Sequence, residues 1–74
     1  MKFKTIGIIG TGYIGTVMAC VLADQGFEII AIENNKNRID DLLNKKVGIN
    51  EPGLEKIFDR NFDRIRFSSD IDQL

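Results

Sequence analysis

Three glycines, Gly10, Gly12 and Gly15, stand between a short apolar run and a stretch of helical periodicity. The run before them, TIGII, is rich in β-branched residues, which is typical of a buried strand in a parallel sheet. From Tyr13 to about residue 25 the apolar residues recur every three or four positions, and Gly26 supplies a helix stop. The chain is therefore constrained to a strand, a tight glycine turn and a helix, in that order.

The rest of the chain continues the alternation. The pattern predicts a strand at 27–33, helices at 34–46 and 51–60, and a strand followed by a turn within 64–70. Pro52 suits the first turn of the helix at 51–60. The order strand, helix, strand, helix, helix, strand predicts an α/β fold with a parallel sheet and right-handed crossovers. We interpret it as the truncated first half of a Rossmann-type doubly wound sheet.

Each glycine has a separate physical role in a dinucleotide-binding turn. Gly10 lets the chain leave the strand in a tight turn. Gly12 has no Cβ, so the backbone can approach a pyrophosphate. Gly15 lets the helix pack close to the first strand. The helix N-terminus then offers unpaired N–H groups and the positive end of its dipole to phosphate.

Glu33, at the end of the second predicted strand, is placed to accept hydrogen bonds from an adenosine ribose. Its carboxylate would repel a 2′-phosphate, which favours NAD over NADP. Arg38, one turn into the next helix, weakens that inference because an arginine there can accommodate the phosphate. FAD remains open as the cofactor, since its folds use the same turn. A glycine bend that binds nothing also remains open.

Composition excludes several classes of function. The 74 residues carry a net charge of −1 with interleaved basic and acidic residues, so no nucleic-acid partner is expected. There is one cysteine and no histidine, so neither an internal disulfide nor a histidine-containing metal site is expected. No apolar run has the length of a transmembrane helix, so no membrane association is expected. We take a cytoplasmic protein as the default.

Four landmarks follow one another along the chain: GTGYIG at 10–15, the acid Glu33 followed by a helix with a basic residue, EPGL at 51–54 and RIRFSSD at 64–70. Together they resemble the N-terminal part of the UDP-glucose/GDP-mannose dehydrogenase family. EPGL is the most discriminating, because nucleotide-binding folds in general do not need it. Glu33 stands where the family more often has Asp, and Gly48 and Asn50 replace its usual Pro and Tyr.

The resemblance implies a parent enzyme that oxidises the 6-hydroxyl of a nucleotide sugar to a carboxylate with two NAD. It implies that the backbone at Tyr13 and Ile14 meets the pyrophosphate, and that Glu33 and Arg38 lie by the adenosine ribose. Residues 1–74 would be the N-terminal part of the dinucleotide-binding domain. The alternative is a stand-alone nucleotide-binding module without catalysis. The family's catalytic cysteine and lysine lie far downstream, so no catalytic residue is expected in this chain.

Two further residues invite other interpretations. Cys20 falls among small and apolar residues of the first helix, where we expect a packing role rather than catalysis. Glu51 could be taken for a general acid, but we expect it to cap the helix at 51–60 and offset its dipole.

The apolar, uncharged run from Thr5 to Ile9 predicts a further property. This strand would be central in the complete sheet, so its outer edge lacks a partner here. We expect the isolated chain to self-associate through that edge, and the parent enzyme to be a homo-oligomer.

Overall fold

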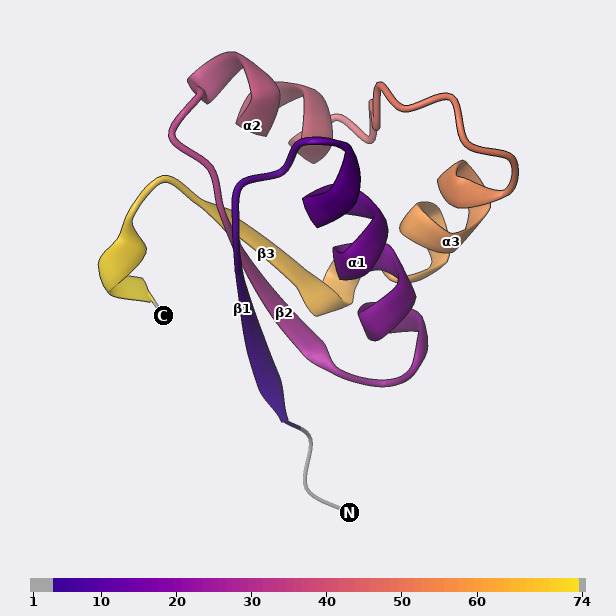
Figure 1. Cartoon of the computed structure of the whole chain (residues 1–74), viewed down its shortest axis with the longest axis horizontal. Coiled ribbons are helices and arrows are strands. Elements are labelled where there is room, and N and C mark those ends of the chain that lie inside the picture. The colour runs from indigo at the N-terminus through magenta and orange to yellow at the C-terminus, as the bar shows by residue number, and fades with distance from the viewer. Residues whose placement is uncertain (1–3, 74) are drawn as a thin grey trace.

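The computed structural model describes residues 4–73, which form one sheet covered on one side by helices (Figure 1). The strands are β1 (Thr5–Ile9), β2 (Glu28–Ile32) and β3 (Ile65–Ser68), and the helices are α1 (Tyr13–Asp24), α2 (Lys36–Leu43) and α3 (Leu54–Arg60). The sheet is parallel with strand order β1-β2-β3. The predicted α/β class and the predicted order of elements are therefore confirmed.

The register of the sheet separates its two faces. One face carries apolar side chains from all three strands, and these pack in or against the core: Ile6, Ile29 and Ile65 in one row, and Ile8, Ala31 and Phe67 in the next. The other face carries Thr5, Gly7 and Ile9 of β1, all exposed. The alternation follows from the two-residue period of a strand.

The helix α1 lies on the core face through small residues. Ala19, Cys20 and Ala23 are almost fully buried, so the helix backbone can come close to the sheet. Ile14 and Met18 of the same helix are at least half exposed, whereas Val17 and Leu22 are partly buried against the core. Cys20 has the packing role predicted for it, and burial raises the pKa of its thiol to about 11, which keeps it protonated.

Two helices are shorter in the structure than the sequence predicted. The helix predicted at 34–46 spans only Lys36–Leu43, because the Asn35 side chain caps its start and the backbone turns left-handed at Lys45. The helix predicted at 51–60 begins at Leu54. Pro52 lies in the turn before it rather than in its first turn, and Gly53 has a left-handed φ of 83° that ends the turn.

The strand and turn predicted at 64–70 are present, with a shift of one residue at the start. β3 is preceded by the 3₁₀ turn η1 (Phe62–Arg64) and followed by η2 (Ile71–Gln73). Arg64 therefore belongs to η1, and the chain bends at Ser69 directly after β3. The predicted strand at 27–33 holds except for its two end residues, and Glu33 still donates its N–H to the Ser68 carbonyl.

Within residues 4–73, β1 pairs only with β2, so its other edge is open. Ile9, at the end of β1, is 68% exposed on the face that no helix covers. The free edge and this bare face meet along the same strand (Figure 1).

Candidate nucleotide site at the carboxyl ends of the strands

The glycine turn joins β1 to α1 and is fixed at both ends by contacts that require glycine. Gly10 has φ +89°, a conformation that L side chains rarely adopt, and its N–H donates to the Ile32 carbonyl at 2.7 Å. A Cβ on Gly15 would lie 2.0 Å from the Gly10 carbonyl oxygen. The roles predicted for Gly10 in turning and for Gly15 in close packing are thus observed in the backbone.

Gly12 differs from the other two glycines of the turn. A Cβ there would meet nothing within 4 Å, and its φ of −69° is open to any residue. Neither packing nor backbone conformation within residues 4–73 therefore requires glycine at this position. The space beside it is what a close approach by a ligand would use.

The N-terminus of α1 is left open for an anion. Gly12 is its N-cap, no side chain caps it, and its first turn contains no acidic residue. The first helical bond runs from the Thr16 N–H to the Gly12 carbonyl, so the N–H groups of Tyr13 and Ile14 have no intrahelical acceptor. The side chains of both residues are exposed. Backbone N–H groups and the helix dipole together favour a phosphate at this point.

Glu33 is held directly beside the turn. One carboxylate oxygen, Oε1, accepts from both the Thr11 hydroxyl (2.7 Å) and the Thr11 N–H (2.9 Å). The other, Oε2, accepts from the Asn35 N–H at 3.0 Å. The hydrogen bond from the Thr11 hydroxyl is the largest of the effects that lower the pKa of Glu33, and the two backbone donors and Arg38 act in the same direction. The carboxylate is therefore ionised at neutral pH.

Arg38 ties three segments together behind the turn. Its Nε donates to the Thr11 carbonyl at 3.0 Å, its Nη2 to the Thr16 hydroxyl at 3.1 Å, and its Nη1 to the Val47 carbonyl. Gly48 follows with φ +72°, and a Cβ there would lie 3.1 Å from Arg38 Nη1. Proline cannot adopt that φ, so the observed backbone at residue 48 is not compatible with the proline that the resemblance leads one to expect there.

A hollow of about 330 Å³ lies where the three strands end, and Gly10 and Glu33 both line it. Its other lining residues are Ile9, Ile32, Asn34, Ser69 and Ile71. The crevice outside the carboxyl ends of the strands is where open α/β sheets bind their ligands. Sequence reasoning missed these five residues and Thr11. Their place just after a strand, or inside the glycine motif, is the signal that could have found them.

Tyr13 and Glu51 meet although 38 residues separate them, the Tyr13 hydroxyl donating to a Glu51 carboxylate oxygen. This hydrogen bond and the neighbouring charge raise the pKa of Tyr13. The prediction that Glu51 caps the third helix is wrong, because α3 starts three residues later and no side chain caps it. Glu51 instead joins the EPGL segment to the glycine turn.

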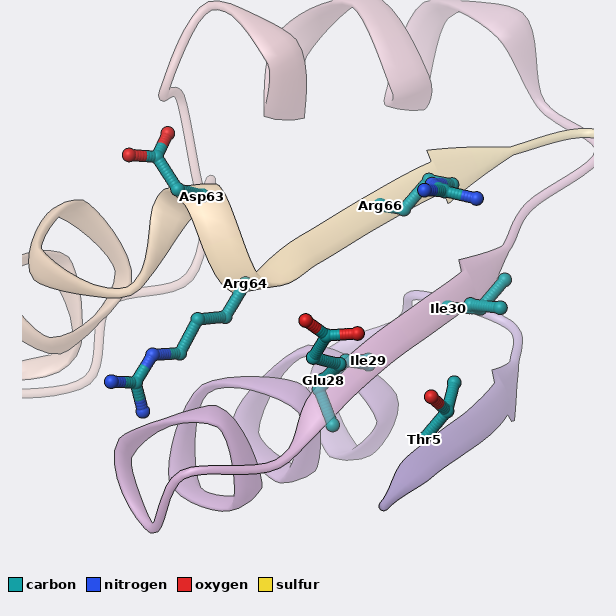
Figure 2. A pocket seen from close by; sticks show the side chains of 7 residues that line it. All are labelled: Thr5, Glu28, Ile29, Ile30, Asp63, Arg64 and Arg66. Atoms are coloured by element: carbon teal, nitrogen blue, oxygen red, sulfur yellow. The ribbon is translucent and has the colours of Figure 1, made fainter. Parts of the chain in front are cut away.

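A second hollow, of about 180 Å³, lies at the opposite, amino ends of the strands (Figure 2). Its charged residues are two acids, Glu28 and Asp63, and two arginines, Arg64 and Arg66. Figure 2 shows the two arginine side chains extending in different directions. These charges balance and do not converge, so this end lacks the arrangement found at the glycine turn.

The glycine turn, the acid after β2 and the EPGL segment all lie within the stretch of this chain that matches one family model. Residues 4–74 match the UDP-glucose/GDP-mannose dehydrogenase family, NAD binding domain. The chain belongs to this family. The resemblance inferred from the sequence is therefore confirmed, and NAD is the cofactor of the family's matched domain.

Relatives in this family include the UDP-N-acetyl-D-mannosamine dehydrogenase of Methanococcus vannielii, 42% identical over 53 residues, and the UDP-glucose 6-dehydrogenase of Bacillus subtilis, 34% identical over 70 residues. The alignments cover 72% and 92% of this chain but only 12% and 15% of those proteins.

Among solved structures, a UDP-glucose dehydrogenase from Pyrobaculum islandicum superposes with a TM-score of 0.88 at 26% identity, covering 97% of this chain and 17% of that one. A GDP-mannose dehydrogenase from Pseudomonas aeruginosa gives 0.85 at 30% identity, covering 96% and 16%. The chain thus spans less than a fifth of the length of these family members.

The residues present fit the adenosine and pyrophosphate half of NAD. The open backbone at Gly12 and the uncapped start of α1 suit phosphate, and Glu33 lines the hollow at the strand ends. Among residues 4–73 no three His, Cys, Asp or Glu side chains are grouped so as to hold a metal ion. In the same part of the chain, no helix has the length and apolar character needed to cross a membrane.

Proposed function

We propose that this chain is the N-terminal part of the NAD-binding domain of a nucleotide-sugar 6-dehydrogenase. The whole protein would oxidise the 6-hydroxyl of a UDP- or GDP-sugar to the carboxylate with two NAD. The observation that supports the proposal is the crevice lined by both Gly10 and Glu33, together with the uncapped start of α1 that follows Gly10 after two residues. Catalysis would require residues of the whole protein that this chain does not contain.

Within the chain, each residue near the cofactor has a distinct part. The backbone of Gly10, Gly12 and Gly15 shapes the turn, and the N–H groups of Tyr13 and Ile14 would hold the pyrophosphate. Glu33 would accept hydrogen bonds from the adenosine ribose hydroxyls. Arg38 would lie near the ribose while holding the turn from behind. NAD supplies hydride acceptance when it is bound.

Isothermal titration calorimetry of the chain with NAD, NADP and FAD tests the cofactor assignment. We expect weak binding of NAD, weaker binding of NADP and no measurable binding of FAD. The matched variant is Gly12→Ala, whose Cβ meets no protein atom within 4 Å and which therefore keeps the fold while obstructing the phosphate. Tighter binding of FAD than of NAD, or unchanged NAD binding by Gly12→Ala, would overturn the assignment.

For the whole protein, NADH formation with UDP-glucose, UDP-N-acetylmannosamine and GDP-mannose as separate substrates tests the reaction. Oxidation of one of the three sugars is the expected result. A folded whole protein that binds NAD and oxidises no nucleotide sugar would contradict the proposed activity. We place that protein in the cytoplasm, because nothing in this chain requires an oxidising compartment: its single cysteine, Cys20, is free and buried.

Self-association of the isolated chain belongs to the same proposal. The support is the open edge of β1, which carries no charged residue from Thr5 to Ile9 and ends on an exposed isoleucine. Light scattering across a concentration series should show a dimer or larger species, and Gly7→Pro in β1 should reduce it. A monodisperse monomer at high concentration would contradict this part. In the whole protein we propose a homo-oligomer.

A further inference from the structure

Thr11, the variable residue between the first two glycines, uses every polar group it has. Its side chain and backbone are 1% exposed. The hydroxyl and N–H both donate to Glu33 Oε1, and the carbonyl accepts from Arg38 Nε and from the Thr16 hydroxyl. It therefore connects the turn, the end of β2, α1 and α2 through one residue.

The contacts of Thr11 restrict the conformation of the long Glu33 side chain. A glutamate has three side-chain torsions, and on a partly exposed strand end it would sample several rotamers. Here one oxygen is held by two donors from Thr11 and the other by the Asn35 N–H. An aspartate would be one methylene shorter and would withdraw from the Thr11 hydroxyl. The longer acid and the threonine hydroxyl thus match each other.

We propose that Thr11 is a positioning residue that sets the preference of this site for a free 2′-hydroxyl over a 2′-phosphate. It does so by holding the Glu33 carboxylate in one place beside the crevice. A fixed carboxylate accepts the ribose hydroxyls and repels a phosphate at the same position. A carboxylate released from Thr11 can rotate away and admit the phosphate. The inference rests on the proposed function, because it assumes adenosine ribose beside Glu33.

Arg38 does not counteract this preference. Each of its guanidinium nitrogens donates to an acceptor within the fold, on Thr11, Thr16 or Val47. Moving the side chain toward a 2′-phosphate would break these bonds. In the sequence, Arg38 left the choice between NAD and NADP open. In the structure its hydrogen bonds stabilise the glycine turn instead.

The test uses ADP-ribose and its 2′-phosphate as probes, since both contain only the half of the cofactor that this chain contacts. Dissociation constants of each are measured for the unaltered chain, Thr11→Val, Thr11→Ser and the control Thr5→Val, with circular dichroism to verify folding. Val keeps the shape of Thr without the hydroxyl, and Ser restores the hydroxyl. Thr5 undergoes the same exchange at an exposed position away from the turn.

We expect Thr11→Val to lower the preference for ADP-ribose over its 2′-phosphate by about tenfold, the size of one charge-assisted hydrogen bond. Thr11→Ser should restore the preference and Thr5→Val should leave it unchanged. If Thr11→Val lowers the affinity for both probes equally, Thr11 is only structural and the inference is overturned. If the folded, unaltered chain binds neither probe, the proposed function fails and the inference with it.

A double-mutant cycle with Glu33→Asp reaches the same question without relying on Thr11→Val alone. Glu33→Asp should lower the preference by itself, and adding Thr11→Val or Thr11→Ser should then change it no further. Additive effects of the two positions would overturn the inference, because they would show that Thr11 does not act through Glu33.

Discussion

The two ends of α1 are both held by an arginine, but in different ways. At the N-terminal end, Arg38 is part-buried and donates to two carbonyls and a hydroxyl, with no carboxylate as its acceptor. At the C-terminal end, Arg60 forms an ion pair with Asp24 at 2.8 Å, and the two side chains are 60% and 36% exposed. Arg38 thus bonds to backbone in two segments, whereas Arg60 joins two side chains in solvent. An arginine bond to the backbone of α1 at this end comes from Arg64 Nη1, which donates to the Ala23 carbonyl at 3.1 Å.

The glycines near the two ends of α1 also differ in how tightly they are packed. Gly15, near the N-terminal end, has no room for a Cβ, which would lie 2.0 Å from backbone oxygen. Gly26, at the C-terminal end, has φ +104° but ample room, and its N–H closes the helix on Ala23. Rigidity is thus concentrated where the cofactor phosphates would bind. The following predictions test this difference, in order of decreasing effect.

Gly15→Ala should have the largest effect. The new Cβ would overlap the Gly10 carbonyl, which is backbone and cannot rotate away, so α1 must move off the turn. We expect a loss of about 3 kcal/mol or more in the free energy of unfolding. Urea denaturation followed by circular dichroism measures it. Gly12→Ala is the control, and an equal loss in the two variants would contradict the account.

Arg38→Met should cost about 2 kcal/mol, since it leaves three acceptors on the turn, α1 and the loop after α2 without their donor. The matched change at the other end of α1 is Arg60→Met, which should leave the free energy of unfolding nearly unaltered because its ion pair is exposed. The same denaturation experiment compares them. A larger loss from Arg60→Met would reverse the comparison.

Gly26→Ala should cost about 1 kcal/mol, because the alanine must adopt a left-handed φ although nothing blocks its side chain. The midpoint of thermal unfolding should fall by less than in Gly15→Ala. A loss as large as that of Gly15→Ala would show that the C-terminal end is as tightly constrained as the turn.

The smallest effect concerns pH. The hydrogen bond from Arg60, followed by that from Asn61, lowers the pKa of Asp24 to about 2. The ionised form is thus favoured in the folded chain, and its contribution to stability is complete above the usual pKa of 3.8 and is lost as the pH falls through about 2. Asp24→Asn should flatten the decline in stability over this range. An unchanged pH profile would contradict a role for the pair.

The sequence predicted correctly those elements that depend on residues close to one another along the chain. The glycines at 10, 12 and 15, the strands around them and the acid at 33 follow from spacing and period, and the structure contains them where expected. The boundary at Pro52 was misplaced, because both a turn and a helix start accept proline, and Gly53 decides between them by its left-handed φ.

Contacts between distant segments could not be predicted in the same way. The partner of Glu51 depends on the path of the loop after α2, and that path brings it to Tyr13. Thr11 was passed over because a variable position in a motif gives no signal until Glu33 and Arg38 are placed around it. The sequence also did not indicate which face of α1 is buried, since small residues such as Ala19 and Ala23 lie inside while the larger Ile14 and Met18 are exposed.

A residue-resolved NMR titration of the ¹⁵N-labelled chain with NAD tests most directly whether the cofactor binds at the glycine turn. We expect amide shifts at Gly12, Tyr13 and Ile14, at Glu33 and Asn34, and at Ser69, with none around Glu28 or Arg66 at the opposite end of the sheet. Shifts concentrated at the amino ends of the strands, or none in a folded chain at saturating NAD, would contradict it.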